Sequence, residues 1–262
     1  MAWRPYSRAG CLAALLWCAG CQASLSPQAR QLLQNGYAAS AGGDSQAVVG
    51  SMDAFLRDNA RSERADEAYY LRGLAKYRLG DKAGGQADLE AALAKTNKKE
   101  LRGKAALALG DLAWDGDDMP TAAAMYGTVL DTVDRSSSPA DHAGYRLGCV
   151  LQRLGRWEDA DLQFSRVMEL FPGTELEARA DRRIHGRAWT VQVGAFENRK
   201  HAEDVVKELA NKSIQADVVP MMNEGKPAFM VQAGRYATYE QAAAALAPVK
   251  KLQSDAFVTA TR

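Results

Sequence analysis

Hydrophobic positions along the chain follow two different periods. From about residue 26 to residue 186, apolar and small residues recur at helical spacing among many Ala, Leu, Arg, Glu and Asp residues. From Trp189 onward, apolar and polar residues alternate in short stretches separated by helical segments, which is the pattern of half-buried strands. The chain is therefore predicted to be multidomain, with an all-α region followed by a smaller α+β domain.

The helical region repeats itself, with copies that start near residues 29, 66, 103 and 141. In the clearest copy, Gly148 is expected to let two helices approach closely, and Gly155 to end the first helix with a positive φ. Phe164 is expected to fill the space between the helices, and Pro172 to stop the second helix. Earlier copies carry Gly110 with Tyr126, Gly73 with Leu89 and, more weakly, Gly36 with Met52.

These residues, with a period of roughly 37 to 38, resemble the tetratricopeptide repeat (TPR), whose standard period is about 34. The resemblance implies a solenoid with a concave groove lined mainly by the first helix of each repeat, and a terminal helix from Glu175 to Ile184. Aromatic and basic groups in the groove suit an extended peptide with acidic or C-terminal carboxylate character. Packing between repeats explains the same residues equally well. The candidate groove residues are Tyr70, Tyr77, Arg78, Lys104, Trp114, His142, Tyr145 and Arg153.

The C-terminal segment duplicates itself. The sequence VQVGAF at 191–196 matches VQAGRY at 231–236, and Ala202 and Ala242 follow at the same interval. One copy cannot cover its own apolar face, so two copies are expected to pair into one antiparallel sheet with both helices on one side. The predicted order is β-α-β-β-α-β, with strands at 189–196, 216–222, 228–236 and 256–261 and helices at 201–212 and 239–252.

This duplicated segment resembles the SPOR domain, a sporulation-related repeat of bacterial cell-wall and division proteins. The resemblance implies binding to peptidoglycan, and specifically to glycan strands without stem peptides at the division septum. Strand alternation is expected to place Gln192 and Gln232 on the open sheet face, where amides can pair with sugar hydroxyl and N-acetyl groups. A solvated strand residue is the alternative for Gln192. The candidate glycan-binding residues are Thr190, Gln192, Ala195, Phe229, Met230 and Gln232.

Two of these residues depart from the family's pattern. Ala195 stands where a small polar residue is often found, and Met230 stands where an Arg is frequent. A methionine donates no hydrogen bond, so the departures bear on glycan affinity more than on the fold.

The N-terminus has the layout of a secretory signal peptide, with Arg4 and Arg8 before an apolar stretch from Ala9 to Gly20. That stretch is too short to span a bilayer as a stable helix. Ala19-Gly20-Cys21 resembles the lipobox of bacterial lipoproteins, although Cys18 stands where Leu is usual. The resemblance implies cleavage before Cys21 and acylation of Cys21, and Gln22 favours the outer over the inner membrane. Ordinary cleavage near Ala23, giving a free periplasmic protein, is the alternative.

Composition and the absence of known motifs mainly exclude classes of function. The 262 residues carry a formal net charge of +1, which gives no reason to expect nucleic-acid binding. Of the four Cys, only Cys149 remains if two leave with the signal peptide and Cys21 is lipidated, so no internal disulfide is expected. The motifs of serine hydrolases, zinc proteases and P-loop enzymes are absent, and Asp115–Asp118 is better explained as a repeat turn than as a calcium loop. We expect no catalytic residue, metal or cofactor.

The sequence thus predicts a signal peptide at 1–20, a lipidated tether at 21–28, TPR-like repeats at 29–186 and a SPOR domain at 187–262. The expected function is a non-enzymatic, lipid-anchored envelope protein of the outer membrane that faces the periplasm. It is expected to bind glycan strands at the septum through SPOR and to recruit an unidentified envelope protein or peptide through the groove. A scaffold for outer-membrane or envelope assembly and an activator of a cell-wall enzyme are the alternatives.

Overall fold

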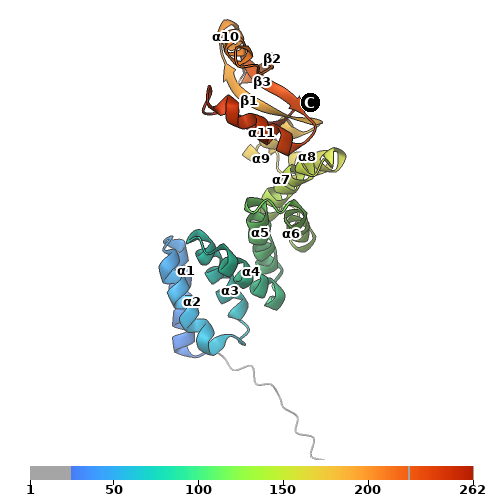
Figure 1. Cartoon of the computed structure of the whole chain (residues 1–262). Helices are drawn as coiled ribbons and strands as arrows, with labels where there is room; N and C mark the ends of the chain where they lie inside the picture. The colour runs from blue at the N-terminus through green and yellow to red at the C-terminus, as the bar shows by residue number, and fades with distance from the viewer. Residues whose placement is uncertain (1–24, 224, 262) are drawn as a thin grey trace, which may run out of the picture.

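The computed structural model describes residues 25–223 and 225–261. The predicted signal peptide and Cys21 lie outside the described residues. The described chain forms a stack of helices that ends in a small sheet domain (Figure 1). Among the described residues, no helix is both long enough and apolar enough to cross a membrane.

The helices of the stack pair as consecutive hairpins, which agrees with the predicted repeats. A terminal helix, α9 (Glu175–Arg183), follows the last hairpin. We call residues 27–183 the helical array. Its hairpins are α1 (Pro27–Ala41) with α2 (Ser45–Asn59), α3 (Ala65–Arg78) with α4 (Lys82–Lys95), α5 (Lys99–Asp115) with α6 (Met119–Thr132), and α7 (Ser138–Arg153) with α8 (Trp157–Leu170).

Each hairpin closes where a glycine of the first helix meets a large side chain of the second. A Cβ atom on Gly148 would lie 2.5 Å from the Phe164 ring, so only glycine allows this helix crossing without movement of the ring. The same relation recurs in all four hairpins at the expected spacing, including the weak first copy. The pairs are Gly36–Met52, Gly73–Leu89, Gly110–Tyr126 and Gly148–Phe164.

The turn inside each hairpin also repeats. Its residue with positive φ lies just after the first helix, and this residue is Asp117 in the third hairpin and glycine in the others. In the third hairpin the next residue, Asp118, accepts a hydrogen bond from Thr121 N and caps α6. The acidic run at 115–118 is therefore a repeat turn. The positive-φ residues are Gly43, Gly80, Asp117 and Gly155, and the capping residues of the first three hairpins are Asp44, Asp81 and Asp118.

The sheet domain, residues 188–261, has the predicted β-α-β-β-α-β order. Its strands form one antiparallel sheet in the order β2-β3-β1-β4. The two repeats pair through their first strands, β1 and β3, at the centre of this sheet. The elements are β1 (Ala188–Phe196), α10 (Arg199–Ala210), β2 (Ala216–Asn223), β3 (Lys226–Tyr236), α11 (Tyr239–Lys250) and β4 (Phe257–Thr261).

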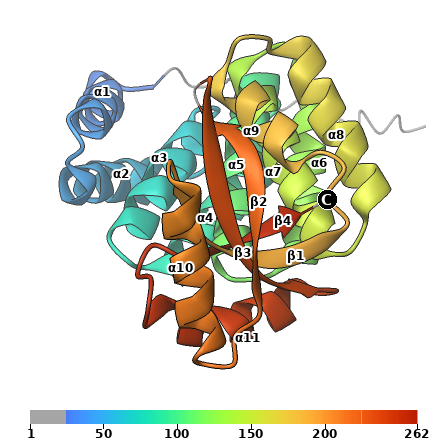
Figure 2. The same ribbon diagram turned by 90° about the horizontal axis from the view of Figure 1, so that it is seen from above.

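Both helices of the sheet domain cover the same face of the sheet. Val191 and Val231, from equivalent positions of the two repeats, are fully buried against Leu209 of α10 and Val249 of α11. Figure 2 views the molecule from the end that carries this domain. Among the described residues, the opposite face of the sheet carries no helix of its own domain, so its side chains lie outside the core under α10 and α11.

Candidate functional site

The open face of the sheet carries a row of side chains across all four strands, polar on three strands and aromatic on the fourth. Gln192 on β1 lies directly opposite Gln232 on β3, with Asp217 on β2 beside Gln232 and Phe257 on β4 beside Gln192. Opposed residues of antiparallel strands share a face, so these four side chains line one band. Gln232 Oε1 accepts a hydrogen bond from Thr261 Oγ1 at 3.3 Å, which orients its amide.

The next pair on the open face is Ala195 with Met230. Ala195 is exposed and Met230 is half-buried, and the Met230 sulfur lies 3.8 Å from Gln232 Nε2. Four of the six predicted glycan-binding residues therefore lie on one face with side chains that are at least partly exposed. The band offers two amides and a carboxylate for hydroxyl and N-acetyl groups, and the Phe257 ring and the Met230 thioether as apolar surface for sugar rings.

Thr190 lies on the same side of β1 as Gln192, because it pairs with Thr259 of β4, but it is not exposed. Its side chain is 1% exposed, and its hydroxyl donates a hydrogen bond to the carbonyl oxygen of Gly234 at 2.8 Å. The register of β1 against β3 shifts here and Gly234 has a φ of 68°, which are the marks of a β-bulge. The Thr190 hydroxyl satisfies a carbonyl of the bulge, so it is not free to bind a sugar.

Phe229 lies on the face that the two helices cover. It pairs with Phe196 in the sheet and packs, half-buried, against the core under the helices. The aromatic residue of the open face is Phe257, which is 49% exposed and was missed by the sequence reasoning. The same alternation that placed Gln192 could have found it, because Phe257 begins the last strand one residue after the buried Ala256.

The second candidate region contains the groove residues predicted for the helical array. Four of the eight predicted groove residues, Trp114, His142, Tyr145 and Arg153, line one cavity of about 530 Å³. α5 supplies Trp114 and α7 supplies the other three, at intervals that keep them on one helix face. This cavity lies where the array meets the sheet domain, because Trp189, Tyr239 and Val258 complete its wall.

The other four predicted groove residues do not line that cavity. Tyr70 packs half-buried between two core clusters of the array. The Tyr77 hydroxyl donates to the Asp115 carboxylate, and this hydrogen bond together with burial raises the pKa of Tyr77 to about 12. Lys104 and Arg78 are exposed, and Lys104 forms an ion pair with Glu100 at 2.5 Å. Tyr70, Tyr77 and Lys104 thus contact their own neighbours in the array.

Sequence reasoning missed several members of the cavity. Arg146 shares the α7 face with Tyr145 and with Cys149, which the repeat pattern had already placed in the groove, so helical spacing could have identified it. Arg179 and Arg183 come from α9, and Tyr239 from the sheet domain, so only tertiary packing brings them in. Burial, followed by the neighbouring Cys149, raises the pKa of Tyr145 to about 12, so its phenol stays neutral.

Aromatic rings and ion pairs hold the sheet domain against the array. Trp189 is 2% exposed, with ring centroids 5.6 Å from Trp157 of α8 and 5.1 Å from Tyr239 of α11. The Arg183 guanidinium lies 5.9 Å from the centre of the Trp189 ring, a cation–π contact from α9. Arg187 reaches back to Asp161 of α8 at 2.8 Å. The position of the cavity is thus fixed by direct contacts between the two domains.

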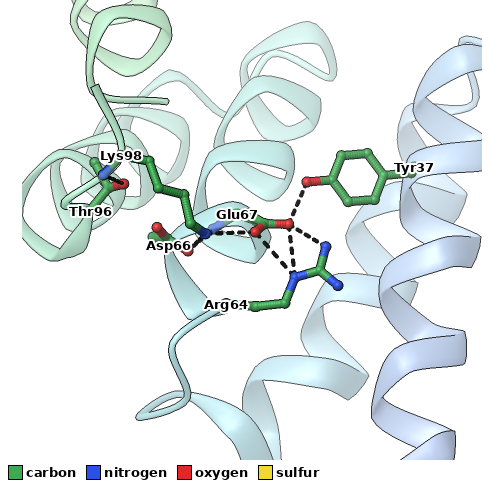
Figure 3. Close-up of polar contacts among 6 residues, drawn as sticks. All are labelled: Tyr37, Arg64, Asp66, Glu67, Thr96 and Lys98. Carbon is green, nitrogen blue, oxygen red and sulfur yellow. Dashed lines mark hydrogen bonds and ion pairs between the residues drawn. The ribbon is translucent and has the colours of Figure 1, made fainter. Parts of the chain in front are cut away.

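A polar cluster near the other end of the array is structural (Figure 3). Glu67 of α3 accepts hydrogen bonds from Tyr37 of α1 at 2.6 Å, from Arg64 at 2.5 Å and from Lys98 at 2.7 Å. Burial raises the pKa of the Glu67 carboxyl, but these three hydrogen bonds outweigh burial and lower it to about 2. The donors already present satisfy the carboxylate, which ties three segments of the array together.

Comparison with known proteins agrees with this architecture. Residues 186–260 match the family model of the SPOR domain. The array superposes on a tetratricopeptide repeat protein from Parabacteroides merdae ATCC 43184 with a TM-score of 0.52 and 16% identity, over 60% of this chain and 58% of that chain. A crystal structure of MamA gives a TM-score of 0.48 and 20% identity, over 58% of this chain and 81% of that chain. No curated protein sequence matches the chain.

The predicted fold class is confirmed: a TPR-like array is followed by a SPOR domain with a four-stranded antiparallel sheet. The SPOR match implies peptidoglycan binding and association with the cell envelope, and the likeness to solved structures shows the fold of the array.

Proposed function

We propose that this protein is a non-enzymatic, lipid-anchored scaffold of the bacterial cell envelope. Its SPOR domain binds glycan strands of peptidoglycan that lack stem peptides, and its TPR-like array holds a protein partner at the same place. The observation that carries the proposal is the band of Asp217, Gln232, Gln192 and Phe257 across the uncovered face of a SPOR domain.

The chemistry of this band favours a neutral sugar polymer. Amide groups donate and accept hydrogen bonds, so Gln192 and Gln232 can each pair with hydroxyl and N-acetyl groups of adjacent sugars. Phe257 offers a ring face to the apolar face of a pyranose. The band carries the Asp217 carboxylate and no positively charged side chain, which disfavours strands whose stem peptides bring further carboxylates.

The binding proposal is tested by co-sedimentation with sacculi. The chain from Gln22 onward keeps every described residue, and we expect it to pellet with amidase-treated sacculi and much less with intact sacculi. Gln192→Ala should weaken pelleting, while Gln86→Ala, an exposed residue of α4, should leave it unchanged. Equal pelleting with both kinds of sacculi, or with neither, would contradict the proposal.

The proposal also includes a lipid anchor at Cys21 and a location at the outer membrane. Ala19-Gly20-Cys21 supports lipidation of Cys21, and Gln22 supports retention at the outer membrane, facing the periplasm. Two or more acyl chains hold a protein durably at a membrane, where one gives marginal binding. Labelled palmitate should enter the full chain and its Cys149→Ser variant, but not Cys21→Ser. Label in Cys21→Ser would contradict the anchor, and a fluorescent fusion of residues 186–262 that stays uniform in dividing cells would contradict septal enrichment.

A further inference from the structure

The cavity between the TPR-like array and the SPOR domain has the size and the lining of a ligand site. Its volume of about 530 Å³ falls within the range of small-ligand pockets. α7 and α9 form one side, and β1, α11 and β4 supply Trp189, Tyr239 and Val258 on the other. Neither domain alone contains this cavity.

The lining is strongly basic. Four arginines and His142 line the cavity, whereas Glu175 is the one acidic residue among the described residues of its wall. Glu175 already pairs with Arg179 at 2.6 Å. Outside the wall, Asp117 pairs with Arg153 at 2.5 Å, and Asp111 lies 4.0 Å from Arg146. The positive charge of the wall exceeds what these carboxylates offset, so the cavity favours an anion. The arginines are Arg146, Arg153, Arg179 and Arg183.

Arg153 carries an unused hydrogen-bond donor. Its side chain is 10% exposed, and its guanidinium stacks 3.8 Å from the centre of the Tyr239 ring of the SPOR domain. One terminal nitrogen donates to Asp117, but Nε is buried and has no hydrogen-bond partner among the described residues. A buried donor without a partner is unfavourable, and an acceptor on a bound ligand that reaches Nε would remove this penalty.

The remaining walls are aromatic and apolar. Trp114 and Tyr145 come from the array, Leu176 from α9, and Trp189 and Tyr239 from the SPOR domain. Such walls suit a ligand that carries carbon surface beside its negative charge, and they give nothing to a bare inorganic anion. Side chains of an acidic peptide supply both carboxylates and methylene groups.

We propose that this cavity binds an acidic peptide segment of the partner protein, with a carboxylate placed against Arg153 and Arg146. The inference rests on the proposed function, because it assigns the chemistry of the partner that the array holds. The SPOR domain forms part of the peptide site through Tyr239. Binding of the partner is therefore linked to the docked arrangement of the two domains.

The probe for the test is fluorescein-labelled tetraglutamate, titrated by the chain from Gln22 onward and followed by fluorescence anisotropy. Loss of a charge-assisted hydrogen bond should weaken binding about tenfold or more in Arg153→Gln and in Arg146→Gln. Arg199→Gln removes the same charge from an exposed site on α10 and should leave the affinity within twofold. Tyr239→Leu should also weaken binding, because it removes the wall that the SPOR domain supplies.

Several results would overturn the proposal. Absence of saturable binding, or equal losses in Arg199→Gln and Arg153→Gln, would show no more than bulk attraction. Competition by inorganic phosphate at the same concentration as unlabelled tetraglutamate would point to a small-anion site instead. A peptide amidated at its C-terminus should bind as well as the free acid if side-chain carboxylates suffice. Because co-sedimentation with sacculi uses none of these residues, its outcome separates failure of this inference from failure of the glycan proposal.

Discussion

The predicted groove residues near α3 and α5 are of the same kinds as those near α7, but the two sets lie in different environments. Tyr77 and Lys104 lie in the half near α3 and α5, where each is paired with an acidic neighbour of the array. Tyr145 and Arg153 lie in the half near α7, where no further repeat follows and the SPOR domain packs instead. A repeated position is therefore available to a ligand only where the neighbouring element leaves it a space and an unpaired donor.

The largest expected effect comes from removing Trp189, which packs the SPOR domain against the array. Trp189→Ala should lower the free energy of unfolding by about 3–5 kcal/mol, because a large buried ring is replaced by a cavity. Urea unfolding measures the change. Trp114→Ala is the control from the cavity wall, since Trp114 is half-buried and its loss should cost clearly less. Equal losses in the two variants would contradict a special role for Trp189 in docking.

The next effect concerns the polar cluster at the amino-terminal end. Glu67→Gln should lower the free energy of unfolding by about 1–2 kcal/mol, between the values of exposed and fully buried ion pairs, because Glu67 is 14% exposed. Urea unfolding at neutral pH measures the change. Glu100→Gln, which breaks an exposed ion pair with Lys104, should show no measurable change.

The same cluster predicts a pH dependence. The pKa of Glu67 is lower in the folded chain, about 2, than its ordinary value of 4.5, so folding stabilises the charged form. The stability contributed by Glu67 is present above pH 4.5 and is lost as the pH falls from 4.5 toward 2. Glu67→Gln should therefore lose less stability than the native chain over this interval. Parallel losses would show that Glu67 is not the group responsible.

A smaller change in tetraglutamate affinity is expected when the carboxylate that pairs with Arg153 is removed. Asp117 has a φ of 63° and holds Arg153 by an ion pair. Asn tolerates the same backbone conformation, so Asp117→Asn removes the charge with little strain. We expect tetraglutamate to bind about two- to fivefold more tightly, since Arg153 loses a competing carboxylate. Weaker binding would mean that Asp117 positions Arg153 for its ligand.

The smallest effect is expected in the other half. Lys104→Gln removes a positive charge that is exposed and already paired with Glu100, so tetraglutamate affinity should change less than twofold. Anisotropy titration under the conditions used for Arg153→Gln measures it. A loss as large as that of Arg153→Gln would extend the peptide site along the whole groove and remove the contrast between its halves.

Local sequence patterns predicted most of the fold because the spacing of residues within one element determines which of its faces is buried. The glycines at 36, 73, 110 and 148 mark helix crossings wherever they occur, since any larger residue would meet the facing side chain. The alternation of VQVGAF and VQAGRY placed Val191 and Val231 in the core and Gln192 and Gln232 on the open face. In both cases the periodicity of one element was enough to assign its buried face.

Patterns in the sequence predicted the repeats, the duplicated sheet and the two amides of the candidate glycan band. They did not predict that Thr190 is buried, because its hydroxyl is bonded to a bulge at Gly234 of the other repeat, and only strand pairing brings the two together. Local patterns could not predict the contact of Arg153 with Tyr239 either, since it joins two domains whose packing no local period encodes. Periodicity assigns a residue to a face, whereas the partner of that face is set by long-range packing.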